Sequence, residues 1–302
     1  MKYGIWRHEN ALGNSAEQVV NLSAFIKEKN DSNPIIFVEK EFQFHMALCI
    51  PNVTYDNVRY FNESELSLDN LNVDYLDNKV LQDIYMPDVY FPDLPLVYPS
   101  TWKSILNSQF QLEFPNNYYE NKFHIPDNAI VFHIRENGTY DKRVEGSGED
   151  LERFVNPNTI LDLMVIYADM GFNIVQIGDK NQKRAPRHPN ILDLCAEDTN
   201  ILDDLYAINK GIVYLSCDSG IWPMVGGLKK NLILSNVTSV YSRKKRFRKH
   251  DIKMVKHEIV SWLPYQSTKV IFKEFSKGKF FDNSINDLKQ AIDSFIIQKT
   301  SR

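Results

Sequence analysis

Charged and polar side chains gather at the end of a predicted strand in the stretch AIVFHIRENGTYDKR, residues 129–143. Its first six residues form an apolar run that is typical of a strand buried on both faces. The residues here that could bind a ligand are His133, Arg135, Glu136, Lys142 and Arg143. A guanidinium can bind a phosphate or the edge of a nucleobase through two parallel hydrogen bonds. Part of this polarity is ordinary loop composition, but so much charge directly after a buried strand favours a binding site.

Two later strand ends are polar as well. Asp179 follows the segment FNIVQI, and the turn CDSG, with Asp218, Ser219 and Gly220, follows the segment GIVYLS. A helix is predicted to start after this turn, and the free N–H groups of a helix N-terminus attract phosphate. Taken singly, Asp179 could be a loop residue and Asp218 a helix cap. Three polar strand ends of one sheet together favour a ligand site.

The elements that must position these residues alternate between strand and helix. Short runs rich in Val, Ile and aromatic residues predict strands at 129–134, 172–177, 211–216 and 231–235. Apolar residues at helical spacing predict helices around 160–168 and 201–208, with Gly171 and Gly211 as helix stops. This alternation indicates right-handed βαβ units and an open α/β sheet. In such sheets, ligands bind beyond the carboxyl ends of the strands.

The first half of the chain repeats the pattern less clearly. It predicts strands at 3–6, 35–38 and 58–61 and a helix at about 15–28, which would bury Val19, Leu22 and Ile26. The segment 62–128 is rich in Asp, Asn and Pro and gives no clear pattern. We therefore predict an α/β protein with two Rossmann-like domains that face a cleft. The predicted boundaries are 1–122, 123–283 and a C-terminal helix at 284–302, with Ser284 and Asp287 as a capping box.

Length and composition limit the possible functions. A chain of 302 residues is long for one core and fits two domains. The 35 basic and 39 acidic residues give a net charge of −4, which argues against nucleic acid as a general partner. Three separated cysteines and no apolar segment typical of a signal peptide or a membrane span favour a cytoplasmic protein without disulfides.

A basic run, SRKKRFRKH at 242–250, holds six Lys and Arg residues. It could be a solvated loop, a peripheral contact with anionic lipid at the inner face of the membrane, or a contact with an acidic acceptor or with the phosphate of a donor.

Residues 129–236 resemble the nucleotide-binding half of GT-B glycosyltransferases. The stretches IVFHIRENGTYDKR, FNIVQIGD and GIVYLSCDSGIW are most similar to those of bacterial surface-polysaccharide transferases, with heptosyltransferase-like and fucosyltransferase-like features. The resemblance implies that Arg135 contacts the donor diphosphate while His133 supports its loop. It also implies that Ser219 and Gly220 offer N–H groups to phosphate, while Asp218 shapes their turn. Arg153 and Asn156 match an Arg/Asn-rich element of the family.

The loop RHENALGNSAEQ, residues 7–18, corresponds to the loop with which related transferases approach the donor and place a catalytic base. In the heptosyltransferase-like pattern an Asp follows the glycine, but here Asn14 follows Gly13, and an amide cannot act as a base. The nearest groups that could accept a proton from an acceptor hydroxyl are Glu9 and then His8. Both could equally be solvated loop residues.

The function we predict is an inverting, metal-independent glycosyltransferase of hexosyl or deoxyhexosyl type. It would move a sugar from a nucleotide-sugar donor to a glycan or lipid-linked acceptor in polysaccharide synthesis, without a further cofactor. The sequence lacks the Asp-x-Asp motif of metal-dependent transferases at any strand end, and Asp203 and Asp204 are adjacent in a helical pattern. The alternatives are a nucleotide-sugar epimerase or hydrolase on the same fold, and a non-catalytic protein that binds carbohydrate or nucleotide.

Overall fold

The computed structural model describes residues 2–4, 12–28, 30–60, 112–135, 155–217, 220–237, 268–276 and 279–300. The chain divides into two compact units. The first comprises residues 1–119 and 227–229, and the second comprises residues 120–226 and 230–302. Each is described separately below.

The first unit contains a parallel sheet of three strands in the order β1-β2-β3. Its elements are β1 (Lys2–Gly4), α1 (Leu12–Glu28), β2 (Ile35–Val38), α2 (Glu41–Ala47), η1 (Tyr55–Asn57), β3 (Val58–Tyr60) and η3 (Asn116–Tyr118). The three predicted strands and the first helix are confirmed, and the helix starts three residues earlier than expected. Val19, Leu22 and Ile26 are buried as predicted. The short helix α2 was not predicted.

A buried polar contact joins the two helices of this unit. Gln43 in α2 donates a hydrogen bond from Nε2 to Oγ of Ser15 in the first part of α1, at 3.0 Å. Its Oε1 accepts from the N–H groups of Glu39 and Lys40, each at 3.0 Å. Both Ser15 and Gln43 are buried, so these bonds fix the start of α1 against the carboxyl end of β2.

The second unit contains a six-stranded sheet in which every pairing is parallel. Its elements are β4 (Ile130–His133), α6 (Pro157–Asp169), β5 (Ile174–Ile177), β6 (Ile191–Asp193), η5 (Leu194–Ala196), α7 (Ile201–Lys210), β7 (Val213–Ser216), α8 (Trp222–Gly227), β8 (Leu232–Val237), β9 (Thr268–Phe272), β10 (Glu274–Ser276), β11 (Lys279–Phe281) and α11 (Ile285–Thr300). The four predicted strands and the two helices between them are confirmed. Strands β6, β9, β10 and β11 were not predicted.

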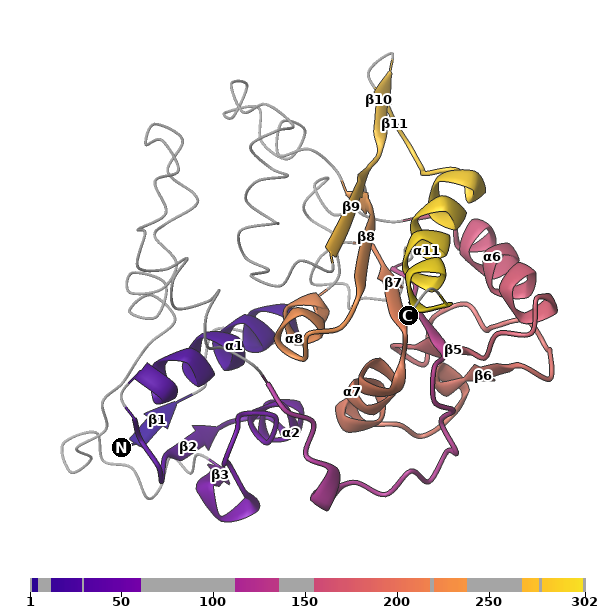
Figure 1. Ribbon diagram of the computed structural model, residues 1–302. Helices are drawn as coiled ribbons and strands as arrows, with labels where there is room; N and C mark the ends of the chain where they lie inside the picture. The colour runs from indigo at the N-terminus through magenta and orange to yellow at the C-terminus, as the bar shows by residue number, and fades with distance from the viewer. Residues whose placement is uncertain are drawn as a thin grey trace. The chain divides into compact units, whose positions relative to one another are not determined.

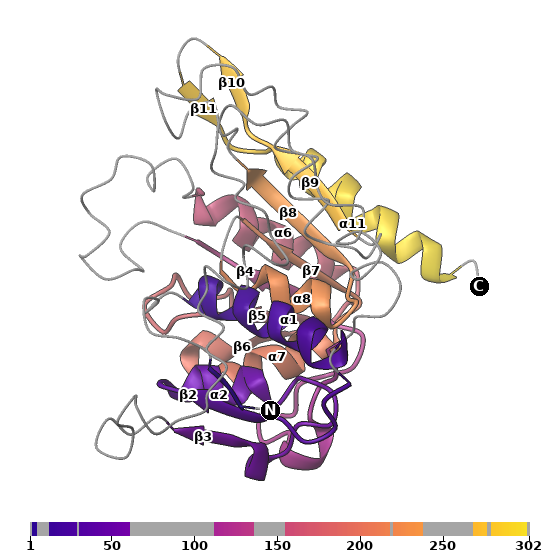
Figure 2. The same cartoon turned by 90° about the vertical axis from the view of Figure 1, so that its left-hand side faces the viewer.

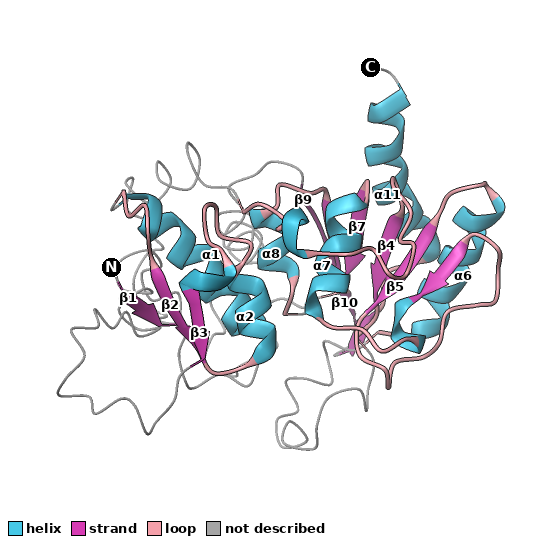
Figure 3. Cartoon of the chain, turned by 90° about the horizontal axis from the view of Figure 1, so that it is seen from below, coloured by secondary structure: helices cyan, strands magenta, loops and turns pink. Residues whose placement is uncertain are grey.

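Helices cover both faces of this sheet. Helices α6 and α11 pack against each other and share a core with alternate residues of the strands, including Ile130, Phe132 and Leu215 (Figure 1). Figure 3 shows α6 and α7 on opposite sides of the strands. This follows from right-handed crossovers, because the chain moves outward from β4 to β6 and then returns to β7 on the other side of β4.

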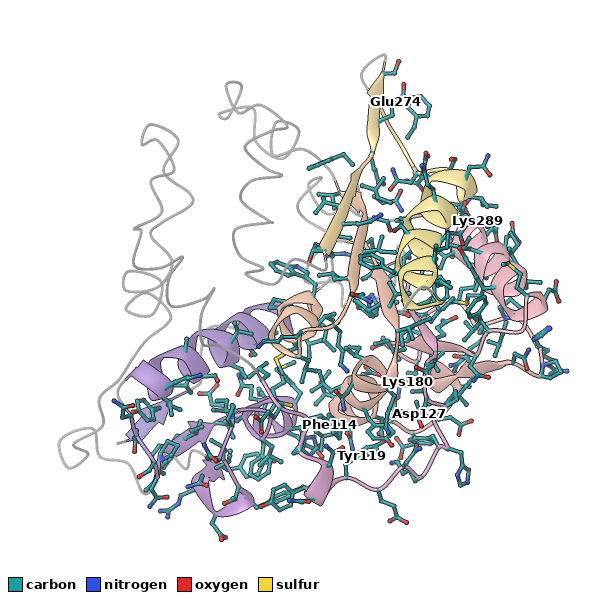
Figure 4. All side chains as sticks on the ribbon, viewed as in Figure 1. Phe114, Tyr119, Asp127, Lys180, Glu274 and Lys289 are labelled. Atoms are coloured by element: carbon teal, nitrogen blue, oxygen red, sulfur yellow. The ribbon has the colours of Figure 1, made fainter. Side chains whose placement is uncertain are left out.

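The C-terminal helix is an integral part of the second unit. Leu288, Ala291 and Ile292 of α11 belong to the core of that sheet. The Tyr167 hydroxyl of α6 donates to Asp293 of α11 at 2.6 Å, and Lys289, labelled in Figure 4, pairs with Asp293 at 2.6 Å. The predicted capping box is confirmed, because Ser284 N–H donates to Asp287 Oδ2 at 3.0 Å and Asp287 N–H donates to Ser284 Oγ at 3.2 Å.

The two predicted glycine stops act in different ways. Gly171 has φ +88°, the left-handed conformation that closes many helices. Gly211 follows the last residue of α7 with an extended backbone, φ −67° and ψ 153°. A Cβ atom there would lie 2.8 Å from Val131 Cγ2, so this glycine is required by the close approach of β4.

The far edge of the sheet is irregular. The pairing of β8 with β9 shifts register between Leu234 and Val237, where Asn236 has φ +54°. Strand β9 leads into the antiparallel hairpin β10–β11, which extends beyond the end of β9 in Figures 1 and 2.

Candidate functional site

The strand order of the second unit identifies one position at the sheet edge. The order β6-β5-β4-β7-β8-β9 is, in chain order within the unit, 3-2-1-4-5-6. The direction of winding reverses between β4 and β7, and open α/β sheets bind their ligands at this switch point, beyond the carboxyl ends of the strands. His133 is the last residue of β4 and pairs in register with Ser216, the last residue of β7. The candidate site is therefore built around these two residues.

His133 is buried and contacts a polar group at each ring nitrogen. Its Nδ1 lies 3.3 Å from Ser216 Oγ, and its Nε2 lies 3.2 Å from Nε2 of Gln182, in the loop after β5. The side chains of all three residues are buried. The imidazole thus joins the carboxyl ends of β4 and β7 to the loop that follows β5.

Hydrogen bonds extend this network from Gln182 to Cys195 in η5 and to Gln176 in β5. Gln182 Oε1 lies 3.7 Å from Cys195 Sγ, and Gln176 Nε2 lies 3.6 Å from the same sulfur. Gln176 is fully buried in β5 and also donates to the Lys183 carbonyl at 2.7 Å. Burial, together with the carboxylates of Asp193 and Asp204, raises the pKa of the Cys195 thiol, so the sulfur keeps its proton.

The partners of the two ring nitrogens favour one tautomer of His133. Ser216 uses its hydroxyl proton on the Cys217 carbonyl, at 2.8 Å, so its Oγ accepts from His133 Nδ1–H. The Gln182 amide nitrogen is a donor, so its contact with Nε2 favours a ring nitrogen without a proton at that position. Burial, and secondarily the charge of Arg135, lower the pKa of His133 to about 4. The imidazole is therefore neutral at physiological pH.

Arg135 lies two residues beyond the end of β4. It is only 8% exposed, and its carbonyl accepts from Val155 N–H at 3.1 Å, which ties it to the segment leading into α6. After burial, its charge is the second cause that lowers the pKa of His133. A buried guanidinium in a region of low dielectric binds an anion more strongly than an exposed one would.

The loop after β5 depends on a glycine. Gly178 has φ +126°, and a Cβ atom there would lie 2.6 Å from Nε2 and 2.7 Å from Oε1 of Gln182. The amide that contacts His133 therefore packs directly on the bare backbone of Gly178. Asp179 is exposed and accepts from Asn181 N–H at 2.7 Å, while Gln182 N–H donates to the Asp179 carbonyl at 3.0 Å. In this structure Asp179 shapes the turn that delivers Gln182.

The sequence predicts Asp204 only as a helix residue, but in the structure it contacts the loop after β5, through the backbone of Gly178. Burial first and Asp203 second raise its pKa, while a hydrogen bond from the backbone of Gly178 opposes the shift. Its Oδ1 is buried and accepts no hydrogen bond from the part of the chain that the structure describes. Both facts favour a protonated acid beside the Gly178 loop. Asp203 is the N-terminal cap partner of Asn200, at 2.8 Å.

A second polar network holds the sheet edge at β8 and β9. Asn236 and Asn283 exchange hydrogen bonds between backbone N–H and side-chain oxygen, at 2.5 and 2.7 Å. Lys273 pairs with Asp282 at 2.7 Å, and Asp282 accepts from Asn156 N–H at 2.7 Å. Asn156 itself caps α6 by accepting from Asn158 N–H. The described geometry gives Asn156 a role in starting this helix.

The remaining predicted residues are placed as follows. Gly13 and Asn14 lie in the first turn of α1. Gly220 precedes α8, which starts at Trp222 and has six residues, so its dipole is small and adds little to phosphate binding. The structure does not describe His8, Glu9, Glu136, Lys142, Arg143, Arg153, Asp218, Ser219 and the basic run 242–250.

An exposed aromatic cluster lies on the first unit. Tyr60, at the end of β3, stacks on Phe44 of α2 with ring centroids 5.3 Å apart, and Tyr55 and Tyr118 extend the cluster. The three tyrosines are 53%, 42% and 38% exposed, in that order. Burial first, and then the charges of Glu41 and Tyr55, raise the pKa of Tyr60.

Neither a metal centre nor a membrane span is found in the described ranges. No group of three or more His, Cys, Asp or Glu side chains there could hold a metal ion. No described helix is long and apolar enough to cross a membrane.

Solved structures place this architecture among the glycosyltransferases. E. coli ADP-heptose LPS heptosyltransferase II aligns over 99% of both chains with a TM-score of 0.57 and 11% identity. The chain has the fold of these transferases. A family 9 glycosyl transferase from Veillonella parvula aligns over 98% of this chain and 97% of its own, with a TM-score of 0.51 and 12% identity. No protein-family model matches the chain, and no curated protein matches it significantly.

These alignments confirm the heptosyltransferase-like resemblance at the level of the fold. They extend it from residues 129–236 to nearly the whole chain.

Proposed function

We propose that the protein is a glycosyltransferase that takes a sugar from a nucleotide-sugar donor bound at the carboxyl end of β4 and β7. The buried guanidinium of Arg135, beside the neutral imidazole of His133 at the switch point, is the observation that carries the proposal. A sugar transfer from such a donor releases a nucleoside diphosphate, and a preorganised cation in a site of low dielectric stabilises that leaving charge. The fold shared with the transferases above supports the same assignment.

The proposed chemistry is inverting and metal-independent. Arg135, with N–H groups from the turn that contains Ser219 and Gly220, would stabilise the diphosphate as the bond to the sugar breaks. An acceptor hydroxyl would attack from the opposite face of the sugar, and Glu9, or else His8, would take its proton. Asn14 and Gly13, at the start of α1, would line the approach of the donor.

The acceptor is proposed to bind on the first unit, and the aromatic cluster around Tyr60 supports this. Sugar rings present C–H faces that pack on exposed aromatic rings, and the tyrosine hydroxyls can bond sugar hydroxyls. An exposed aromatic group of this kind commonly marks an interaction site. The acceptor would be a glycan or a lipid-linked glycan in polysaccharide synthesis. The basic run 242–250 would then contact the inner face of the membrane from the cytoplasm.

A screen of nucleotides tests the donor assignment. The melting temperature of the purified protein is measured with UDP, GDP, CMP, dTDP and ADP, for the wild type and for Arg135→Ala. ADP is of interest because the E. coli protein with the same fold is an ADP-heptose LPS heptosyltransferase. A ligand that binds only the native state raises its apparent stability, so one nucleotide should raise the melting temperature of the wild type alone. If none does so, the assignment is wrong.

Turnover then separates the transferase from its alternatives. A transferase releases the nucleoside diphosphate faster when an acceptor glycan is added. A hydrolase or an epimerase consumes the donor without an acceptor, and a binding protein consumes none. Glu9→Gln should abolish turnover in a transferase and leave nucleotide binding intact.

A further inference from the structure

We propose that Gln182 is a positioning residue of the donor site, because its amide fixes His133 as the neutral tautomer with the proton on Nδ1. This inference rests on the proposed function for its effect on donor binding. The tautomer itself can be tested without any ligand.

The hydrogen bonds around His133 form one chain that runs in a single direction. Gln176 donates to Cys195 Sγ, the thiol donates to Gln182 Oε1, and Gln182 Nε2 donates to His133 Nε2. His133 Nδ1 then donates to Ser216 Oγ, whose hydroxyl donates to the adjacent carbonyl of Cys217. Because the Gln182 amide N–H faces His133 Nε2, a proton on that ring nitrogen would face another donor.

The chain crosses the strands that form the candidate site. It starts in β5, passes through η5 and the loop after β5, and ends at the carboxyl ends of β4 and β7. All five side chains in it are at most 8% exposed. A buried donor or acceptor that loses its partner is costly, so each bond of the chain holds the two side chains that it joins in place.

The neutral ring matters because of its neighbour. Arg135 lies close enough for its charge to act on His133. An imidazolium in the same place would repel the guanidinium and would compete with it for an anion. With its Nε2 occupied by Gln182, the imidazole remains a fixed, uncharged support, and Arg135 supplies the positive charge of this pair.

The decisive variant is Gln182→Glu, which keeps the length of the side chain but replaces the N–H donor with an acceptor. Nitrogen NMR of the ring distinguishes an unprotonated Nε2 from a protonated one, and His133→Asn identifies its signal among the seven histidines. We expect an unprotonated Nε2 in the wild type at pH 7 and a protonated Nε2 in Gln182→Glu. A protonated Nε2 in the wild type overturns the proposal.

A matched control separates positioning from general damage to the core. Gln176→Met removes another buried glutamine of the chain, one that contacts Cys195 but not His133. Nε2 of His133 should stay unprotonated in this variant. Gln182→Met, which has no donor, serves as a second test if Gln182→Glu does not fold, because it should also allow the proton to move to Nε2.

The effect on the donor site is measured as affinity for the nucleotide found in the screen. We expect Gln182→Glu to weaken binding by about tenfold, equivalent to about 1.4 kcal/mol, and Gln176→Met to weaken it less. A changed tautomer with unchanged affinity overturns the positioning role. A wild type that binds no nucleotide overturns the proposed function, and the ring nitrogen then still decides whether Gln182 sets the tautomer.

Discussion

Substituting Gly178 by alanine should break the contact between Gln182 and His133. The added Cβ would lie 2.6 Å from Gln182 Nε2, 2.7 Å from Oε1 and 2.9 Å from Cδ. Carbon atoms in ordinary contact are about 3.5–4.0 Å from their neighbours, so the amide must retreat by roughly 0.9 Å. If it moves away from the imidazole, the 3.2 Å bond to His133 becomes about 4.1 Å long, which is no longer a hydrogen bond.

The expected loss of stability has two parts. An alanine at φ +126° costs about 1–3 kcal/mol of backbone strain. A buried polar group left without its partner costs about 1–3 kcal/mol more. Gly171→Ala is the matched control, because Gly171 also has a positive φ but no atom lies within 4 Å of its added Cβ. Gly171→Ala should therefore lose only the stability that corresponds to the backbone strain.

Urea unfolding and the melting temperature of both variants measure the difference. A loss of 1 kcal/mol lowers the melting temperature of a unit of this size by about 2–4 °C. Gly178→Ala should therefore melt at least about 2 °C below Gly171→Ala, and its His133 ring signal should change while that of the control does not. Equal melting temperatures with an unchanged ring would refute the reasoning.

Two further predictions concern pH and the acceptor. Folding lowers the pKa of His133 to about 4, from about 6.5 in the unfolded chain. As the pH falls, the unfolded chain therefore takes up the proton first. The stability that the neutral ring contributes should be complete above about pH 6.5 and should fall as the pH drops toward 4. The free energy of unfolding in urea, measured for the wild type and His133→Asn across this pH range, checks the prediction. If it depends on pH in the same way in both proteins, the prediction is wrong. Tyr60→Ala removes the most exposed ring of the aromatic cluster. It should raise the KM for the acceptor roughly 2-fold to 13-fold and leave nucleotide affinity unchanged, since a stacking contact is worth about 0.5–1.5 kcal/mol. An unchanged KM would remove this cluster from the acceptor site.

Much of the second unit is predictable from sequence because its strands are buried on both faces. Continuous apolar runs at 129–134 and 211–216 leave little ambiguity, and the helix between 160 and 168 has a clear apolar face. Strand β6, Ile191–Asp193, is only half-buried and three residues long. Strand β9 is half-buried throughout, without an alternation of buried and exposed residues. Such segments are defined by pairing partners that are distant in sequence, which no local pattern contains.

The candidate site was only partly visible in the sequence. His133 and Arg135 stand out because they end an apolar run, and the structure places both at the switch point. Gln182 and Cys195 do not stand out, since their importance comes from contacts across the sheet. One local signal was present for the network: Gln176 is a polar residue inside the apolar segment FNIVQI, and a buried amide needs partners. Asp179 is also conspicuous in the sequence, and in the structure its carboxylate accepts from Asn181 N–H in its own turn.

The most direct test of the account is the affinity of the wild type, Arg135→Lys and Arg135→Ala for the nucleoside diphosphate found in the screen, measured by calorimetry. A charge-assisted hydrogen bond contributes about 1.5–3 kcal/mol, so Arg135→Ala should bind roughly 10-fold to 150-fold more weakly. Arg135→Lys keeps the charge but loses the bidentate geometry and should lie between the two. The same affinity in all three proteins would show that the donor does not bind at the carboxyl end of β4.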